Sequence, residues 1–127
     1  MDVGSIYRPW VVAIEGDERL AAAAVRMQDE QVGSLVVLEH GRFAGILTER
    51  DLVRALAEGA DPEVATVADY MTAAPAVVTS DATVREVAAT MLELECRHLP
   101  VVDSGGAVLG MVSIRDLLGT AVRPGRE

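Results

Sequence analysis

Apolar residues recur along this chain with two different spacings, and the two spacings alternate in the same order twice. Short β-prone runs at 11–14 and 76–79 end at turn or cap residues, which predicts two strands. The segments that follow place apolar residues three and four positions apart, which predicts helices that each bury one stripe. These stripes are Leu20, Ala23, Ala24 and Met27 in the first copy, and Val84, Val87, Ala88 and Met91 in the second.

Each predicted helix is followed by two apolar runs around a turn, a pattern typical of a β-hairpin. In the first copy the runs cover 34–38 and 43–47, with the turn at 39–41. In the second copy they cover 99–102 and 108–112.

A last helix is expected over 49–58, where Gly59 would end it, and another over 114–121. Each copy therefore has the order β-α-β-β-α, and the copies span 3–66 and 67–122. A repeat of this length decides the fold, because each copy is one unit of secondary structure. The predicted fold class is α/β (α+β), built from two such repeats.

The repeat is clearest where the last strand meets the last helix, at Gly45–Leu52 and Gly110–Leu117. Each stretch has a glycine, two apolar residues, a hydroxyl residue, one variable residue and then Arg-Asp-Leu. Thr48 and Ser113 are expected to cap the helices, with the aspartate three residues later completing a capping box. The amide groups at a helix start also favour anions, so a pair of phosphate-ligand sites is the alternative.

Composition narrows the classes of function. The formal net charge is −9 and no basic stripe occurs, which argues against a nucleic-acid partner. No apolar run approaches the roughly 18–20 residues of a membrane span, and the start of the chain lacks the pattern of a signal peptide. We therefore expect a cytoplasmic protein without a membrane partner.

The reactive residue types are few. Cys96 is the single cysteine, which excludes an internal disulfide, and with only His40 and His98 a zinc site is not expected. Cys96 is expected to pack as a small hydrophobe. No Ser-His-Asp set, metal-ligand cluster or glycine-rich phosphate loop is present, so the sequence predicts neither an enzyme nor a required cofactor.

The duplicated unit resembles the CBS domain, named after cystathionine β-synthase. The resemblance rests on the duplicated Gly45–Leu52 motif, on Val67–Thr72, which is like the family's lead-in to a repeat, and on Arg97–Asp103. It implies a Bateman module, in which two repeats pack through their sheets about a pseudo-twofold axis and leave two clefts. The implied ligands are adenosine compounds such as AMP, ATP or S-adenosylmethionine, and the implied role is regulation of an effector protein.

The resemblance also implies which residues contact the ligand. Its aspartate binds ribose hydroxyls, and its threonine or serine lies near phosphate, where an arginine fork would also fit. One cleft would combine Thr48, Arg50 and Asp51 with Ala76, Val77, Val78, Thr79, Arg97 and His98. The other would combine Ser113, Arg115 and Asp116 with the first strand, including Ala13 and Ile14.

The two clefts are not expected to be equal. The cleft of Thr48 would hold two arginines and a histidine, whereas the other has one arginine and places Glu15 where the first has Thr79. We therefore expect the cleft of Thr48 to bind phosphate better. For Arg50 and Arg115 a plain surface ion pair is the alternative. The family precedent is also a homodimer, for which the small residues Ala21–Ala24 would provide a smooth helix face. A module that only dimerises, with empty clefts, is the rival function.

Overall fold

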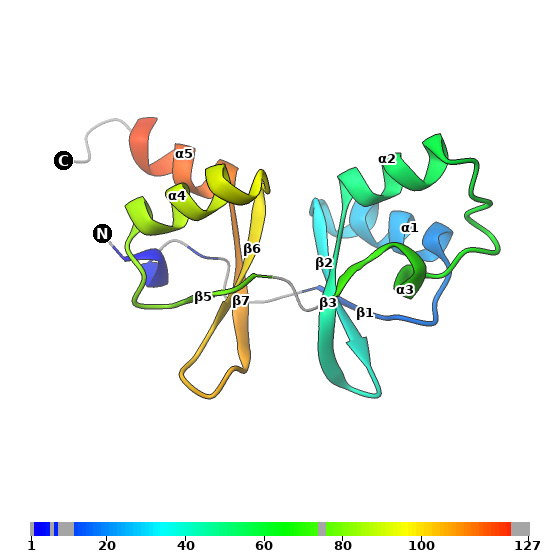
Figure 1. Ribbon diagram of the computed structural model, residues 1–127, viewed down its shortest axis with the longest axis horizontal. Helices are drawn as coiled ribbons and strands as arrows, with labels where there is room; N and C mark the ends of the chain where they lie inside the picture. Colours follow the sequence, from blue (N-terminus) through cyan, green and yellow to red (C-terminus); the bar gives the residue numbers. More distant parts are fainter. Residues whose placement is uncertain (1, 6, 8–11, 74–75, 123–127) are drawn as a thin grey trace. The chain divides into compact units, whose positions relative to one another are not determined.

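The computed structural model describes residues 2–5, 7, 12–73 and 76–122. The chain forms two compact units, Val12–Pro75 and Met1–Val11 together with Ala76–Glu127. We call them the repeat-1 unit and the repeat-2 unit, and describe each by itself (Figure 1).

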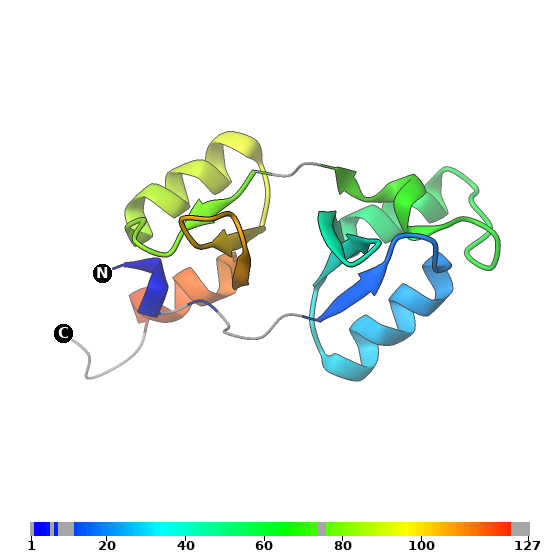
Figure 2. The same ribbon diagram turned by 90° about the horizontal axis from the view of Figure 1, so that it is seen from below.

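The repeat-1 unit is a four-stranded sheet with helices on one face. Its sheet has the order β1-β2-β3-β4, in which β1 and β2 are parallel and the other neighbours antiparallel. Leu35 and Val37 project from the same face of β2 and are fully buried with residues of both long helices. The two helices therefore cover one face of the sheet (Figure 2). The elements are β1 (Ala13–Glu15), α1 (Leu20–Glu30), β2 (Ser34–Glu39), β3 (Arg42–Thr48), α2 (Glu49–Ala57), α3 (Val67–Tyr70) and β4 (Thr72–Ala73).

The repeat-2 unit has the same plan with a three-stranded sheet in the order β5-β6-β7. The strand β5 is parallel to β6, and β6 is antiparallel to β7. Its core combines Val87 and Met91 of one helix with strand residues such as Leu99, Val101 and Val112. The elements are the 3-10 helix η1 (Val3–Ser5), β5 (Val78–Thr79), α4 (Val84–Leu94), β6 (His98–Val102), β7 (Val108–Ser113) and α5 (Ile114–Val122).

Each repeat begins with a lead-in segment whose valine is buried in the core formed by the other repeat. Val3 and Val67 are both fully buried, Val3 in the core of the repeat-2 unit and Val67 in that of the repeat-1 unit. The backbone amide of Val3 donates to the Ala82 carbonyl at 2.8 Å, and that of Val67 donates to the Glu18 carbonyl at 2.8 Å. The compact units therefore differ from the sequence repeats 3–66 and 67–122, because each unit takes its lead-in from the other repeat.

The predicted α+β class and the order of elements are confirmed, with shifted boundaries. The first strand begins at Ala13, and Val11, which the prediction included, lies outside the described residues. Ala24 is exposed, so the buried stripe of α1 is narrower than predicted. Ala21 is only half exposed and its amide donates to the Pro62 carbonyl at 3.0 Å. Ala21–Ala24 therefore is not the smooth open face we expected, because the connector after α2 crosses its first turn.

The turn between β2 and β3 consists of His40 and Gly41. His40 and Gly41 have φ of 55° and 78°, the left-handed conformation that a type I′ hairpin turn requires at both central positions. His40 is exposed, as a turn residue is expected to be. Within the described residues, no helix combines the length and the hydrophobicity that a bilayer span requires.

Candidate ligand-binding corners

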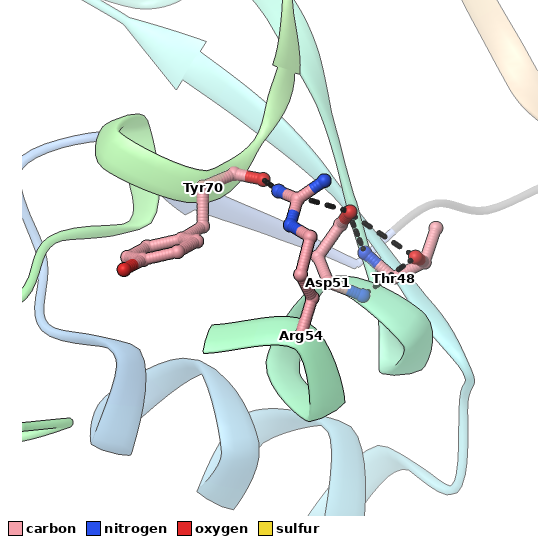
Figure 3. Close-up of polar contacts among 4 residues, drawn as sticks. All are labelled: Thr48, Asp51, Arg54 and Tyr70. Atoms are coloured by element: carbon pink, nitrogen blue, oxygen red, sulfur yellow. Dashed lines mark hydrogen bonds and ion pairs between the residues drawn. The ribbon is translucent and has the colours of Figure 1, made fainter. Parts of the chain in front are cut away.

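The first candidate site is the junction of β3 and α2, which we call the first corner; the equivalent junction of β7 and α5 is the second corner. Thr48 has extended backbone angles and is the N-cap of α2, and its hydroxyl accepts from the Asp51 amide at 3.3 Å. In return Asp51 Oδ2 accepts from the Thr48 amide at 2.9 Å and from the Thr48 hydroxyl at 3.1 Å (Figure 3). The predicted capping box is confirmed. The two side chains that we expect to contact a ligand therefore also stabilise the start of α2.

The second oxygen of Asp51 is also engaged. Asp51 is only 6% exposed, and its Oδ1 lies 3.7 Å from Arg54 Nη2. The same nitrogen donates to the Tyr70 carbonyl at 3.0 Å, and the Arg54 guanidinium lies 5.7 Å from the centroid of the Tyr70 ring (Figure 3). The sequence analysis missed Arg54. The signal was available, because an arginine follows Asp51 by three residues on one helix face.

The second candidate site is the junction of β7 and α5, which repeats the cap. Asp116 Oδ2 accepts from the Ser113 amide at 2.8 Å, and the Asp116 amide donates to the Ser113 hydroxyl at 3.2 Å. Asp116 is half-buried, in contrast to Asp51. Gly119 stands where the first corner has Arg54, three residues after the aspartate. The two corners thus share the cap and differ in what surrounds the carboxylate.

In each unit, the residue before the hairpin accepts a hydrogen bond from the first residue of the helix at the corner. The Gly33 carbonyl accepts from the Glu49 amide at 3.1 Å, and the Arg97 carbonyl accepts from the Ile114 amide at 2.8 Å. His98 pairs with Ser113 across β6 and β7. Within the repeat-2 unit, the backbone of Arg97 and His98 therefore lies beside the second corner. Their predicted approach to Thr48 and Asp51 stays a prediction.

The remaining predicted residues divide between the units. Arg50 and Arg115 are exposed in the first turns of α2 and α5, which suits either a ligand or a surface ion pair. In β1, Ile14 is 2% exposed and its side chain belongs to the core. Any contact of Ile14 with a ligand would therefore involve its backbone.

Ala13, the neighbour of Ile14 in β1, already has a side-chain donor on its backbone carbonyl. The Ala13 carbonyl accepts from Arg26 Nη1 at 2.5 Å, a contact that the sequence analysis did not anticipate. In the second repeat Thr90 occupies the position equivalent to Arg26, and it donates to the Glu86 carbonyl of its own helix at 3.0 Å.

The first strand of the second repeat carries the other predicted residues. Ala76 and Val77 are exposed before β5, while Val78 and Thr79 form the strand. The Thr79 hydroxyl donates to Asp81 Oδ1 at 2.5 Å.

The described residues offer little for binding a metal ion or for a reactive thiol. Among them no three His, Cys, Asp or Glu side chains gather where they would hold a metal ion. Cys96 is half-buried against the repeat-2 core, as expected, and its burial raises the pKa of the thiol above its ordinary value. A raised pKa keeps the thiol protonated and therefore poorly nucleophilic.

Comparison with known proteins connects this geometry to a family. The CBS domain model matches residues 3–58 and 67–123. An uncharacterised 17.7 kDa protein of Acidianus ambivalens is 40% identical over 116 residues, which are 91% of this chain and 70% of that protein. The structure of a hexameric CBS-CP12 protein from bloom-forming cyanobacteria has a TM-score of 0.88 and 29% identity, covering 99% of this chain and 77% of that one.

A further solved structure contains adenosine ligands. The CBS domain pair of protein MJ0100, in complex with 5′-methylthioadenosine and S-adenosyl-L-methionine, has a TM-score of 0.86 and 25% identity. The match covers 95% of this chain and 95% of that chain. With the family model matched twice along its length, this chain belongs to the CBS domain family and carries two CBS domains in tandem.

Proposed function

We propose that this chain is a non-catalytic regulatory module that binds an adenosine-type nucleotide and signals its presence to a partner protein. The duplicated corner is the observation that carries the proposal: each copy holds an aspartate fixed by a capping hydroxyl residue at a helix start. A carboxylate held in this way can accept from both hydroxyls of a ribose, and the adjoining helix start favours phosphate. The adenosine complex of the MJ0100 domain pair supports the ligand class.

The proposal assigns unequal roles to the two corners. The corner of Thr48, Arg50 and Asp51 would be the stronger phosphate site, with Ala76–Thr79, Arg97 and His98 completing it as the family pattern implies. Each charge-assisted hydrogen bond is worth roughly 1.5–3 kcal/mol, so a difference of one gives about tenfold or more in affinity. Titrating ATP into Asp51→Ala and Asp116→Ala separately is the test. If Asp116→Ala abolishes the tightest binding while Asp51→Ala preserves it, the ranking is reversed.

A melting screen tests the ligand class itself. AMP, ATP and S-adenosylmethionine would be added separately, with GMP as a matched control that changes only the base. A ligand at a hundred times its dissociation constant adds about 2.7 kcal/mol to the free energy of unfolding, so the melting temperature should rise clearly. A protein that none of the adenosine compounds stabilises would contradict the proposal.

The rival function is a dimerisation module without a nucleotide ligand. Large apolar side chains are exposed on helices of both units: Leu56 in α2 is 63% exposed, Leu92 in α4 is 81% exposed and Leu118 in α5 is 57% exposed. Covering such side chains with a second copy would remove apolar surface from water, which favours association. Regulation and dimerisation are compatible, and we propose a homodimer in either case. Light scattering at micromolar concentration should give twice the chain mass, and a monomer mass would contradict the dimer.

A further inference from the structure

Arg54 makes the two corners different in a way that reaches beyond the ligand site. Its guanidinium contacts Asp51 Oδ1 at 3.7 Å and donates to the Tyr70 carbonyl at 3.0 Å, so one side chain joins the corner to the end of α3. The Tyr70 ring lies 5.7 Å from the guanidinium and adds a cation–π contact (Figure 3). The repeat-2 unit has Gly119 at this position, which has no side chain to make such a link.

The segment that Arg54 holds is the last part of the repeat-1 unit. Tyr70 ends α3, and Thr72–Ala73 then form β4, which pairs with β3 over two residue positions only. So short a pairing gives little local stability, and elements of this kind open more readily than the core. Tyr70 and Met71 also pack against the repeat-1 core, so Arg54 provides one of several contacts that keep this segment in place.

We propose that Arg54 couples the state of the Asp51 carboxylate to the α3–β4 segment at the end of the repeat-1 unit. Arg54 is half exposed, and an exposed ion pair of this kind is weak. Ribose hydroxyls that donate to Asp51 displace the guanidinium, and the Tyr70 carbonyl then loses an anchored donor. The α3–β4 segment loosens as a result. The ligand step rests on the proposed function, whereas the link between Asp51, Arg54 and Tyr70 does not.

Hydrogen exchange of the ligand-free protein tests the link directly. Asp51→Asn retains an oxygen for the Thr48 amide but removes the charge that holds Arg54, and Arg54→Gln removes the guanidinium. Both variants should raise the exchange rate of peptides covering Tyr70–Ala73 several-fold. Asp116→Asn is the matched control, because it changes the same cap in the repeat-2 unit, where Gly119 stands at the position of Arg54, and it should leave these peptides unchanged. Wild-type exchange in both Asp51→Asn and Arg54→Gln overturns the proposal, as does an equal increase in Asp116→Asn.

The same measurement with AMP, ATP or S-adenosylmethionine tests the ligand step. Ligand should accelerate exchange at Tyr70–Ala73 in the wild type and have little further effect in Arg54→Gln. Because the ligand no longer competes with the guanidinium, Arg54→Gln should bind up to about fivefold more tightly, which corresponds to about 1 kcal/mol. If no compound binds, the proposed function fails while the ligand-free variants still decide the link. If a compound binds but leaves exchange at Tyr70–Ala73 unchanged, the coupling is wrong.

Discussion

Truncating Asp51 should destabilise the protein more than the same change at Asp116. Asp51→Ala removes the acceptor of the Thr48 amide and hydroxyl and the partner of Arg54. Loss of a capping interaction costs about 0.5–2 kcal/mol, and an exposed ion pair adds about 0.2–1 kcal/mol. The Thr48 amide also loses its partner in a half-buried place, which brings the expected total to about 2–3 kcal/mol.

The corresponding change at Asp116 should cost about 1 kcal/mol, the typical value of a cap. Asp116 is half-buried rather than buried, so water can replace part of what the carboxylate provides. Asp51→Asn separates the contributions, because an amide oxygen still accepts from the Thr48 backbone while the charge is gone. We expect it to lose about half as much as Asp51→Ala.

Urea denaturation measures these differences as shifts of the midpoint at constant slope. For a chain of 127 residues, a loss of about 2 kcal/mol corresponds to a fall of roughly 6–10 °C in melting temperature. The reasoning is refuted if Asp51→Ala loses less than about 0.5 kcal/mol, or no more than Asp116→Ala, since the burial of Asp51 and its contact with Arg54 would then contribute nothing.

Four other outcomes follow from local structure. A Cβ at Gly45 would clash with the Thr72 carbonyl oxygen of β4, so Gly45→Ala should cost about 1–3 kcal/mol in urea denaturation. A Cβ at Gly119 would lie in open space on α5, so Gly119→Ala should stabilise the protein by up to about 1 kcal/mol. The amide and hydroxyl of Thr66 hold the pKa of Asp69 below its ordinary value of 3.8, so its stabilising effect is present above that pH and lost as pH falls through the folded-state pKa. Melting of Asp69→Asn should therefore depend less on pH in acid than melting of the wild type, and an equal dependence would exclude this role. Burial raises the pKa of the Cys96 thiol, so iodoacetamide should alkylate it more slowly in the native protein than in urea, and equal rates would contradict the burial.

The sequence predicted the features that depend on neighbouring residues. Helix stripes, hairpins and capping boxes involve residues at most a few positions apart, so their spacing alone specifies them. Thr83 and Glu86 illustrate this: they stand three residues apart at the start of α4, and the Thr83 amide donates to Glu86 Oε1 at 2.8 Å. The capping contacts of Asp51 and Asp116 were predictable in the same way, because each aspartate stands three residues after its hydroxyl partner.

Features that depend on distant parts of the chain were not predictable in this way. Val3 and Val67 occupy equivalent places in the repeat, but the spacing is the same whichever unit buries them. Their placement is decided by tertiary contacts, such as the bond from the Val3 amide to the Ala82 carbonyl. Ala24 fits the apolar spacing of α1 yet is exposed, because spacing indicates the direction of a stripe and not its width.

The structural and ligand-binding roles of Asp51 are compatible because they use different oxygens. Both contacts with Thr48 go to Oδ2, so the cap fixes the carboxylate and determines where Oδ1 lies. Oδ1 contacts Arg54 at 3.7 Å, a weak pair worth about 0.2–1 kcal/mol. A ribose hydroxyl that donates to Oδ1 would form a hydrogen bond to a charged acceptor, worth about 1.5–3 kcal/mol, and the exchange favours the ligand. In the proposed function the cap therefore preorganises the carboxylate, and Arg54 is the contact that the ligand replaces.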